Sequence, residues 1–326
     1  MQAKIQFNCV ISPYPAQKIV NLPLFKMNME LKEHFNNKIF KLISETADEL
    51  GVECYVVGGY VRDIFLKRPS KDIDVVVVGS GIEMAQAFGR KLGRGAHVSV
   101  FKNFGTAQVK YHDTEVEFVG ARKESYSHDS RKPVVEDGTL EDDQNRRDFT
   151  INAMAYHPKE GIVDLFHGMD DMQNKVIRCV GDPLERFHED ALRIMRAVRF
   201  SAQLGFEIEE ETKAGISRLT QNLRNVSAER IQAELVKLLV SPHPDYLRVA
   251  YETGITKEFL PEFDRCMETE QNTPYHCFTV GEHILHSLLY VEADKVLRLT
   301  MLLHDIAKPV MKTTDENGRD HSKCIR

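Results

Sequence analysis

Three features are missing from the sequence: tryptophan, an apolar run long enough to cross a membrane, and an excess of positive charge. The absence of tryptophan excludes nothing. A membrane span needs roughly 18–20 apolar residues, and no run approaches that length. Pro13 and Pro15 interrupt the apolar residues near the N-terminus, which makes this segment a poor signal peptide. We therefore expect a cytoplasmic protein without a membrane partner.

The charge balance and the cysteines argue against two further classes of protein. The 43 basic and 49 acidic residues give a net charge of −6. This excludes a globally basic nucleic-acid coat, so a polyanionic partner must be held by a local basic face or through metal ions. The six cysteines contain no C-x-x-C pair, which predicts reduced thiols in place of a disulfide framework or a zinc site. They are Cys9, Cys54, Cys179, Cys266, Cys277 and Cys324.

The length of 326 residues predicts two or three domains, and the composition is that of an ordinary globular protein. Residues 1–27 show no periodicity, and we expect a loose extension there. The following part alternates helical patterns with short apolar segments, which predicts a mixed α/β head with a small sheet. Its expected helices cover 30–50, 60–66 and 82–92, and its expected strands cover 54–57, 72–78, 97–101, 106–111 and 115–119.

The remaining part of the chain has a different pattern. Residues 123–145 are polar, and we expect a mobile loop there. From about residue 183 the pattern is wholly helical, and strand signals do not return. The expected helices cover 183–204, 209–222, 227–240, 244–253 and 279–307. The predicted fold class is therefore α+β, with a head built on a small mixed sheet followed by an all-helical neck and body.

Two aspartates open the segment DIDVVVV. Side chains of a strand alternate between faces, so Asp72 and Asp74 point the same way, about 7 Å apart, while Ile73 faces the core. Two such carboxylates repel each other unless cations bridge them. Mg²⁺ prefers a few carboxylates together with substrate phosphates, so the pair predicts a magnesium site. For this pair alone, an exposed strand start with two solvated acids is the alternative.

Glycines and an arginine just upstream favour the metal interpretation. Gly58 and Gly59 separate a strand from a helix, and glycine lets backbone N–H groups approach a phosphate. Arg62, one turn into that helix, can reach the same phosphates. A two-metal site needs a third acid, and Glu115 and Glu117 share one face of a later strand. We favour Glu117, with an ordinary alternating edge strand as the alternative.

Three long motifs carry a family resemblance that covers roughly residues 52–245. The motifs are GGYVRDIFLKRPSKDID at 58–74, RRDFTINA at 146–153 and DPLERFHEDALRIMRAVRF at 182–200. They resemble the nucleotidyltransferase branch that contains class II CCA-adding enzymes and bacterial poly(A) polymerases. The resemblance implies a polymerase-beta-like head that adds CCA to the 3′ end of tRNA without a template. CTP and ATP would be the substrates, and pyrophosphate would be released.

The resemblance also implies roles for individual residues. The catalytic acids that hold two Mg²⁺ ions would be Asp72, Asp74 and Glu117. The nucleotide phosphates would be contacted by Gly58, Gly59, Arg62 and Arg147. Three neighbours of Arg147 have simpler interpretations. Arg146 could be a surface charge, Asn152 could cap or orient the chain locally, and Asp148 has either a direct role or caps a helix over 149–156.

The helix expected around 187–204 is the distinctive element. Its residues Asp190, Arg193, Arg196 and Arg199 recur every three positions and form a drifting polar stripe. An aspartate acceptor and an arginine donor together match the Watson–Crick edges of C and A, which both present an amino group beside a ring-nitrogen acceptor. By resemblance, Asp190 and Arg193 read the base, and the other two arginines lie nearer the phosphates or sugar. A solvated charged face with an Asp190–Arg193 pair is the alternative.

Residues 275–309 resemble HD-type metal phosphohydrolase domains. The HD dipeptide is His304-Asp305, and His283 is the favoured upstream ligand, with His276 as an alternative. Imidazoles with a carboxylate suit a transition metal. The set of ligands looks incomplete, so we expect a truncated HD region and favour a structural helical remnant over a working phosphohydrolase.

These patterns predict four segments: an extension at 1–27, a nucleotidyltransferase head at 28–168, a helical neck at 169–245, and a helical body with a partial HD domain at 246–326. Three other functions stay open. The chain could add only A or poly(A), it could be a weakly active fragment that binds RNA or nucleotide, or it could be an HD phosphohydrolase with a vestigial head. The sequence does not indicate the oligomeric state.

Overall fold

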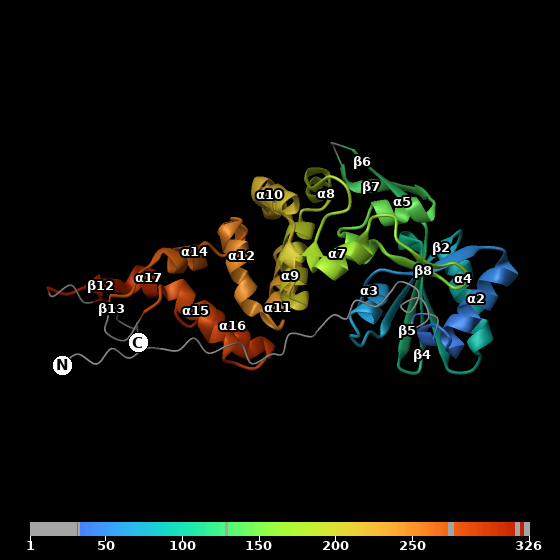
Figure 1. The fold of residues 1–326 in the computed structure, drawn as a ribbon, viewed down its shortest axis with the longest axis horizontal. Helices are drawn as coiled ribbons and strands as arrows, with labels where there is room; N and C mark the ends of the chain where they lie inside the picture. Colours follow the sequence, from blue (N-terminus) through green and yellow to red (C-terminus); the bar gives the residue numbers. More distant parts are fainter. Residues whose placement is uncertain (1–30, 32, 128–129, 273–276, 317–319, 323–326) are drawn as a thin grey trace.

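The computed structural model describes residues 31, 33–127, 130–272, 277–316 and 320–322. The described part is elongated, with the sheet at one end and the last helices at the other (Figure 1). The extension expected at 1–27 and the alternative ligand His276 lie outside the described residues. No helix in these described ranges combines the length and the apolar character that crossing a membrane requires.

A seven-stranded mixed sheet forms the head, with the strand order β3-β4-β5-β2-β1-β8-β9. The strands are β1 (Glu53–Val57), β2 (Asp72–Val78), β3 (Ala96–Phe101), β4 (Thr106–Tyr111), β5 (Thr114–Gly120), β8 (Ala155–His157) and β9 (Gly161–Val163). The first five confirm the strands predicted from sequence. The last two are only three residues long and give no periodic signal. The predicted α+β class and the small mixed sheet are confirmed, with two strands more than expected.

Two helices cover one face of this sheet. They are α2 (Lys38–Leu50), which packs on β1, and α4 (Gly81–Leu92), which packs on β3, β4 and β5. The core beneath them contains Ile73 and Val75 of β2 together with Phe88 of α4. Because strand side chains alternate, the even-numbered residues of β2 lie on the opposite face. That is the face on which Asp72 and Asp74 stand.

The mobile loop predicted for 123–145 is wrong. This segment forms an antiparallel hairpin of β6 (Arg122–Ser127) and β7 (Ser130–Asp137), followed by the helix α5 (Leu140–Asn145). The two strands pair only with each other, so the hairpin does not join the main sheet. The sequence of this segment shows no apolar alternation, and for that reason the strands were not predicted. A capping box between Thr139 and Asp142 starts α5.

The prediction that strands do not return after residue 183 is also wrong. A short strand β11 (Glu207–Ile208) pairs in parallel with β10 (Val176–Ile177), and β12 (Lys312–Thr314) pairs with β13 (Asp320–Ser322). Strands of two or three residues are too short to show a period of two. The helix α6 (Thr150–Ala153) directly precedes β8, and the helix α7 (Gly168–Asn174) connects β9 to β10.

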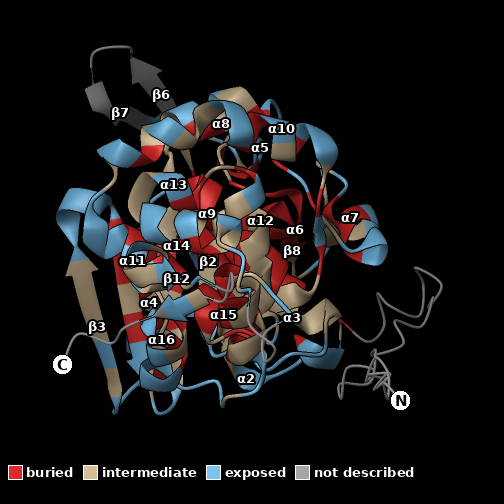
Figure 2. Cartoon of the chain, turned by 90° about the vertical axis from the view of Figure 1, so that its left-hand side faces the viewer, coloured by how far each residue is buried: buried red, intermediate tan, exposed pale blue. Residues whose placement is uncertain are grey.

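The rest of the described chain is mainly helical. The helices are α8 (Pro183–Glu189), α9 (Leu192–Leu204), α10 (Glu210–Leu219), α11 (Ala228–Leu239), α12 (Leu247–Glu252), α13 (Thr256–Phe259), α14 (Pro261–Glu268), α15 (Val280–Leu289), α16 (Lys295–Leu303) and α17 (Lys308–Met311). The single helices predicted over 183–204 and 279–307 are each two helices. The first breaks at Asp190, whose backbone is extended at φ −143° and ψ 103°. Helix α9 is buried along most of its length (Figure 2), as expected for a central helix with apolar residues on several faces.

Candidate active site

Carboxylates on two neighbouring strands form the centre of the site. Strands β2 and β5 are parallel, and their register places Asp72 opposite Glu115 and Asp74 opposite Glu117. Residues paired in this way point to the same side of a sheet. Glu115 already pairs with Lys110 at 3.0 Å and accepts a hydrogen bond from Gln108. The predicted choice of Glu117 as the third acid therefore fits the register and the charge balance.

The neighbouring negative charges affect the pKa of Asp74. The pKa of this carboxyl is raised to about 6, chiefly by burial; Arg147 opposes the rise, and Glu117 and Asp72 add to it. Like charges gathered on a partly buried strand disfavour ionisation unless a cation compensates them. Three carboxylates with this arrangement fit a hard divalent cation such as Mg²⁺, which takes oxygen ligands.

A glycine turn faces these acids. Gly58 follows β1 and precedes α3 (Gly59–Phe65), and its φ of +73° lies in the region that favours glycine. A Cβ at this position would lie 2.9 Å from Nη1 of Arg147 and 3.9 Å from Oδ2 of Asp74. The bare backbone of Gly58 thus brings the predicted phosphate turn, Arg147 and a predicted metal ligand to one place.

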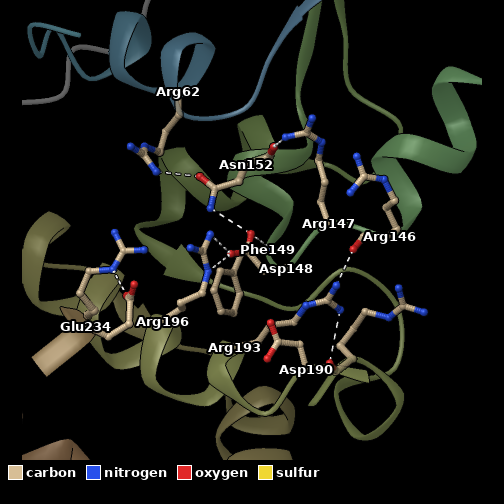
Figure 3. Close-up of polar contacts among 12 residues, drawn as sticks. Arg62, Arg146, Arg147, Asp148, Phe149, Asn152, Asp190, Arg193, Arg196 and Glu234 are labelled. Carbon is tan, nitrogen blue, oxygen red and sulfur yellow. Dashed lines mark hydrogen bonds and ion pairs between the residues drawn. The ribbon is translucent and has the colours of Figure 1, made fainter. Parts of the chain in front are cut away.

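Arg62 extends from α3 toward Asn152 (Figure 3). Its Nη1 donates to Oδ1 of Asn152 at 2.7 Å, and its Nε donates to Asp63 at 3.0 Å. Burial lowers the pKa of Arg62, and Asp63 opposes that shift. Its guanidinium also lies 5.1 Å from the ring centre of Phe200. Arg62 therefore links α3 to α6 and α9. Its Nη2 also lies 3.5 Å from the position that a Cβ on Gly59 would occupy.

The RRD segment is built differently from the prediction. Arg146 is not a surface charge, because it pairs with the buried Asp143. Asp148 does not cap a helix over 149–156: the N-cap of α6 is Phe149. Instead, Asp148 accepts hydrogen bonds through Oδ1 from the backbone N–H of Phe149 and from Asn152, and through Oδ2 from Nε of Arg196 at 2.7 Å. Figure 3 shows these contacts converging between the head and α9.

The predicted base reader lies where α8 ends and α9 begins. Asp190 accepts a hydrogen bond from the N–H of Leu192 and pairs with Arg230 at 2.9 Å. Arg193 pairs with Glu189 at 2.8 Å, and its Nη2 donates to the backbone oxygen of Arg146 at 2.7 Å. The predicted continuous stripe is wrong because the helix breaks at Asp190. The two residues lie in one short segment, each with its own protein partners.

The two remaining arginines of α9 have partners that sequence reasoning missed. Arg199 donates to Glu234 of α11 at 2.7 Å, and its guanidinium lies 3.6 Å from the ring centre of Phe200. Arg196 is bound to Asp148 and also faces the Phe200 ring. Glu234 lies in the helix predicted over 227–240, and no role was predicted for it from the sequence. No local pattern indicated this tertiary ion pair.

A second cluster of potential metal ligands lies on α15 and at the end of α16. His283, His304 and Asp305 each offer one ligand atom, and these atoms lie within 4.8 Å of one another. The Nε2 atoms of the two histidines are 3.2 Å apart. Lys308 places its Nζ 2.7 Å from Oδ2 of Asp305. The structure thus brings together the three residues predicted for an HD site, and a lysine ammonium stands beside them.

Comparison with known proteins identifies two family regions. Residues 54–178 match the model of the poly A polymerase head domain. Residues 205–267 match a model described as the probable RNA and SrmB-binding site of polymerase A. The first region contains the carboxylates, the glycine turn and the RRD segment.

Curated relatives carry one name. The CCA-adding enzyme of Lactobacillus helveticus is 39% identical over 224 residues, which cover 68% of this chain and 54% of the relative. The CCA-adding enzyme of Streptococcus gordonii is 36% identical over 284 residues, which cover 82% of this chain and 68% of the relative. The chain therefore spans about half to two thirds of the length of these relatives.

Solved structures give the same answer. A tRNA nucleotidyltransferase complexed with a primer tRNA and an incoming ATP analogue is 29% identical, with a TM-score of 0.65, over 81% of this chain and 75% of that one. The Thermotoga maritima CCA-adding enzyme complexed with tRNA is 26% identical, with a TM-score of 0.63, over 87% of this chain and 73% of that one. The chain belongs to the family of the CCA-adding tRNA nucleotidyltransferases, within the group that shares the poly A polymerase head domain.

Proposed function

We propose that this chain adds C, C and A to the 3′ end of tRNA from CTP and ATP, without a template and with release of pyrophosphate. The observation that carries the proposal is the set of carboxylates on β2 and β5 that faces the Gly58 turn and Arg147. The names of the relatives support CCA addition over the A-adding, fragment and phosphohydrolase alternatives. Three buried, free cysteines, Cys54, Cys179 and Cys266, suit a reducing compartment, and we propose a cytoplasmic location.

The acids would hold two Mg²⁺ ions through Asp72, Asp74 and Glu117. Bound there, the ions would supply Lewis-acid activation of the RNA 3′-hydroxyl and stabilise the charge of the leaving pyrophosphate. The protein's own residues do the positioning. The Gly58 turn admits the triphosphate close to the backbone, and Arg147 and Arg62 offer N–H donors to its oxygens. No protein nucleophile is required, since positioning and electrostatics carry phosphoryl transfer.

Base choice would fall to Asp190 and Arg193. Each has protein partners, Arg230 for the carboxylate and Glu189 for the guanidinium. A carboxylate offers about four acceptor sites and a guanidinium five donors, so both retain capacity for a base. Asp190 would accept a hydrogen bond from the amino group of C or A, and Arg193 would donate a hydrogen bond to the adjacent ring nitrogen. U and G present the opposite order of groups and would be rejected.

The domain division stays part of this proposal. Residues 28–168 would be the catalytic head, 169–245 the neck that carries the base reader, and 246–326 the helical body. The HD cluster would bind a transition metal through His283, His304 and Asp305 as a second, separate property. The distances among the ligand atoms favour it, while the ammonium of Lys308 competes for the same carboxylate.

Incorporation of labelled CTP and ATP into a tRNA transcript that lacks its CCA end tests the proposed activity. With Mg²⁺, we expect two additions from CTP alone, and with both nucleotides an ordered C, C, A that then stops. Long A tails would indicate a poly(A) polymerase instead. Absence of any incorporation would contradict the proposal. A transcript that already ends in CCA is the control and should accept nothing.

A further inference from the structure

Asp143 of α5 is a buried charge with two arginine partners. Its residue is fully buried, and aspartate is almost never so unless it is paired. It accepts hydrogen bonds from Nε and Nη2 of Arg147 at 3.1 and 2.9 Å, and it also pairs with Arg146. Burial raises the pKa of this carboxyl, but Arg147 and Arg146 together hold it below the ordinary value. Asp143 is therefore ionised at neutral pH.

Asp143 determines where the guanidinium of Arg147 lies. Two of the three nitrogens of the Arg147 guanidinium, Nε and Nη2, donate to the same oxygen of Asp143, Oδ2. The third, Nη1, donates to the backbone oxygen of Asn152 at 3.3 Å and stands beside the Gly58 turn. An unrestrained arginine side chain has a large rotamer entropy, which is lost when a ligand fixes it. Holding it in place before the ligand arrives removes that cost from binding.

The helix that carries Asp143 is itself anchored. The neighbouring Gln144 is buried, and its Nε2 donates to the backbone oxygens of Ala153, at the end of α6, and of Val163, at the end of β9. The capping box at Thr139 closes the other end of α5. A short helix with these attachments is a rigid support, which is what a positioned side chain needs.

We propose that Asp143 is a positioning residue that fixes Arg147 beside the Gly58 turn for the triphosphate of the incoming nucleotide, without touching the nucleotide itself. The inference rests on the proposed function in taking a nucleoside triphosphate as the ligand. It makes a distinct claim, because it concerns the affinity for the phosphates common to CTP and ATP and not the choice between bases.

Nucleotide binding by the full chain, measured by isothermal titration with CTP or ATP and Mg²⁺, tests this role without RNA or turnover. Asp143→Asn keeps the shape of the side chain and removes its charge. We expect it to weaken the binding of both nucleotides by about tenfold or more, to the same extent, since a charge-assisted hydrogen bond carries that much. Glu141→Gln is the matched control on the same helix: Glu141 is exposed and lies outside the capping box, and its variant should bind as the wild type does.

A double-mutant cycle separates positioning from a general loss of structure. If Asp143 acts through Arg147, Arg147→Ala alone shows the whole loss of affinity, and Asp143→Asn added to it costs no more than about twofold. The comparison of the double variant with Arg147→Ala does not use the single Asp143→Asn chain, so it still tests the inference if that chain fails to fold.

Three results would overturn the inference: unchanged affinity in a folded Asp143→Asn chain, a double variant far weaker than Arg147→Ala, or a wild type that binds neither nucleotide. A wild type that binds both nucleotides but never extends tRNA would instead overturn the proposed function and leave this binding result standing.

Discussion

At the scale of single residues, the site holds charges in places that folding alone would not favour. Asp74 is partly buried beside Asp72 and Glu117, and its pKa of about 6 shows that the metal-free protein resists ionising it. An isolated carboxyl of aspartate titrates near 3.9. When ionised, such a carboxylate lowers the free energy of unfolding at neutral pH, and a bound cation would remove this cost.

This leads to a prediction for Asp74→Asn in the metal-free protein. A carboxyl whose pKa is raised on folding contributes stability below its unfolded pKa near 4, and loses it as the pH rises through about 6. We therefore expect the asparagine variant to be more stable than the wild type by on the order of 2 kcal/mol at pH 8 with EDTA, and about equally stable at pH 4.

Denaturant unfolding at both pH values measures the difference. The same variant should lose CTP incorporation with Mg²⁺, since it removes a proposed metal ligand while the fold is retained. Glu115→Gln is a matched control on β5: Glu115 pairs with Lys110 and is not a proposed metal ligand. A destabilised Asp74→Asn chain at pH 8, or one that still transfers nucleotides at the wild-type rate, would contradict the account of this residue.

At the scale of elements, the sequence predicted the strands that carry the site better than the elements that support it. Apolar, β-branched residues bounded by turns predict strands β1 to β5. No such pattern predicts the break between α8 and α9, because helical spacing continues across Asp190. The strands β6 and β7 form a separate two-stranded sheet, and α5 is six residues long. Glu234 meets Arg199 only after the chain folds, so no local spacing could reveal that pair. Asp143 stands three and four residues before its arginines, but the loop predicted over 123–145 left that helical spacing unrecognised.

The pair of Arg199 and Glu234 joins α9 to α11 and gives the element-scale prediction. Both side chains are more than nine-tenths buried, and removing one partner of such a pair leaves an uncompensated charge. We expect Glu234→Ala to reduce the free energy of unfolding by about 3–5 kcal/mol. Base selection by the folded fraction should be unchanged, because Arg199 is occupied by structural contacts with Glu234, Gln203 and Phe200.

Thermal unfolding followed by circular dichroism provides the measurement for this pair. Glu229→Ala on the exposed first turn of α11 is the control, and its cost should stay below about 1 kcal/mol. If Glu234→Ala is no more costly than Glu229→Ala, the pair does not stabilise the contact between the helices. If it is stable but loses affinity for nucleotide, Arg199 contacts the substrate as the family resemblance implies.

At the scale of the whole molecule, two sets of proposed metal ligands stand at opposite ends of the elongated described part of the chain (Figure 1). The carboxylates of β2 and β5 lie in the head, and the histidines lie on α15 and after α16 at the other end (Figure 1). The sets also differ in chemistry, since one is all oxygen and the other is mainly imidazole nitrogen. Separation and ligand type together predict two sites that load independently.

Binding of Mn²⁺ to an Asp72→Ala/Asp74→Ala chain, followed by equilibrium dialysis, isolates the HD cluster. We expect one remaining site that is lost in His304→Ala. Lys308→Ala should strengthen Mn²⁺ binding at this site, because the ammonium 2.7 Å from Asp305 opposes a cation there. Lys295→Ala, on the exposed start of α16, should have no effect.

The His304→Ala variant alone should add CCA at the wild-type rate. Absence of Mn²⁺ binding in the double variant would make the three ligands a structural cluster, and a loss of CCA addition in His304→Ala would mean that the two ends of the molecule are coupled.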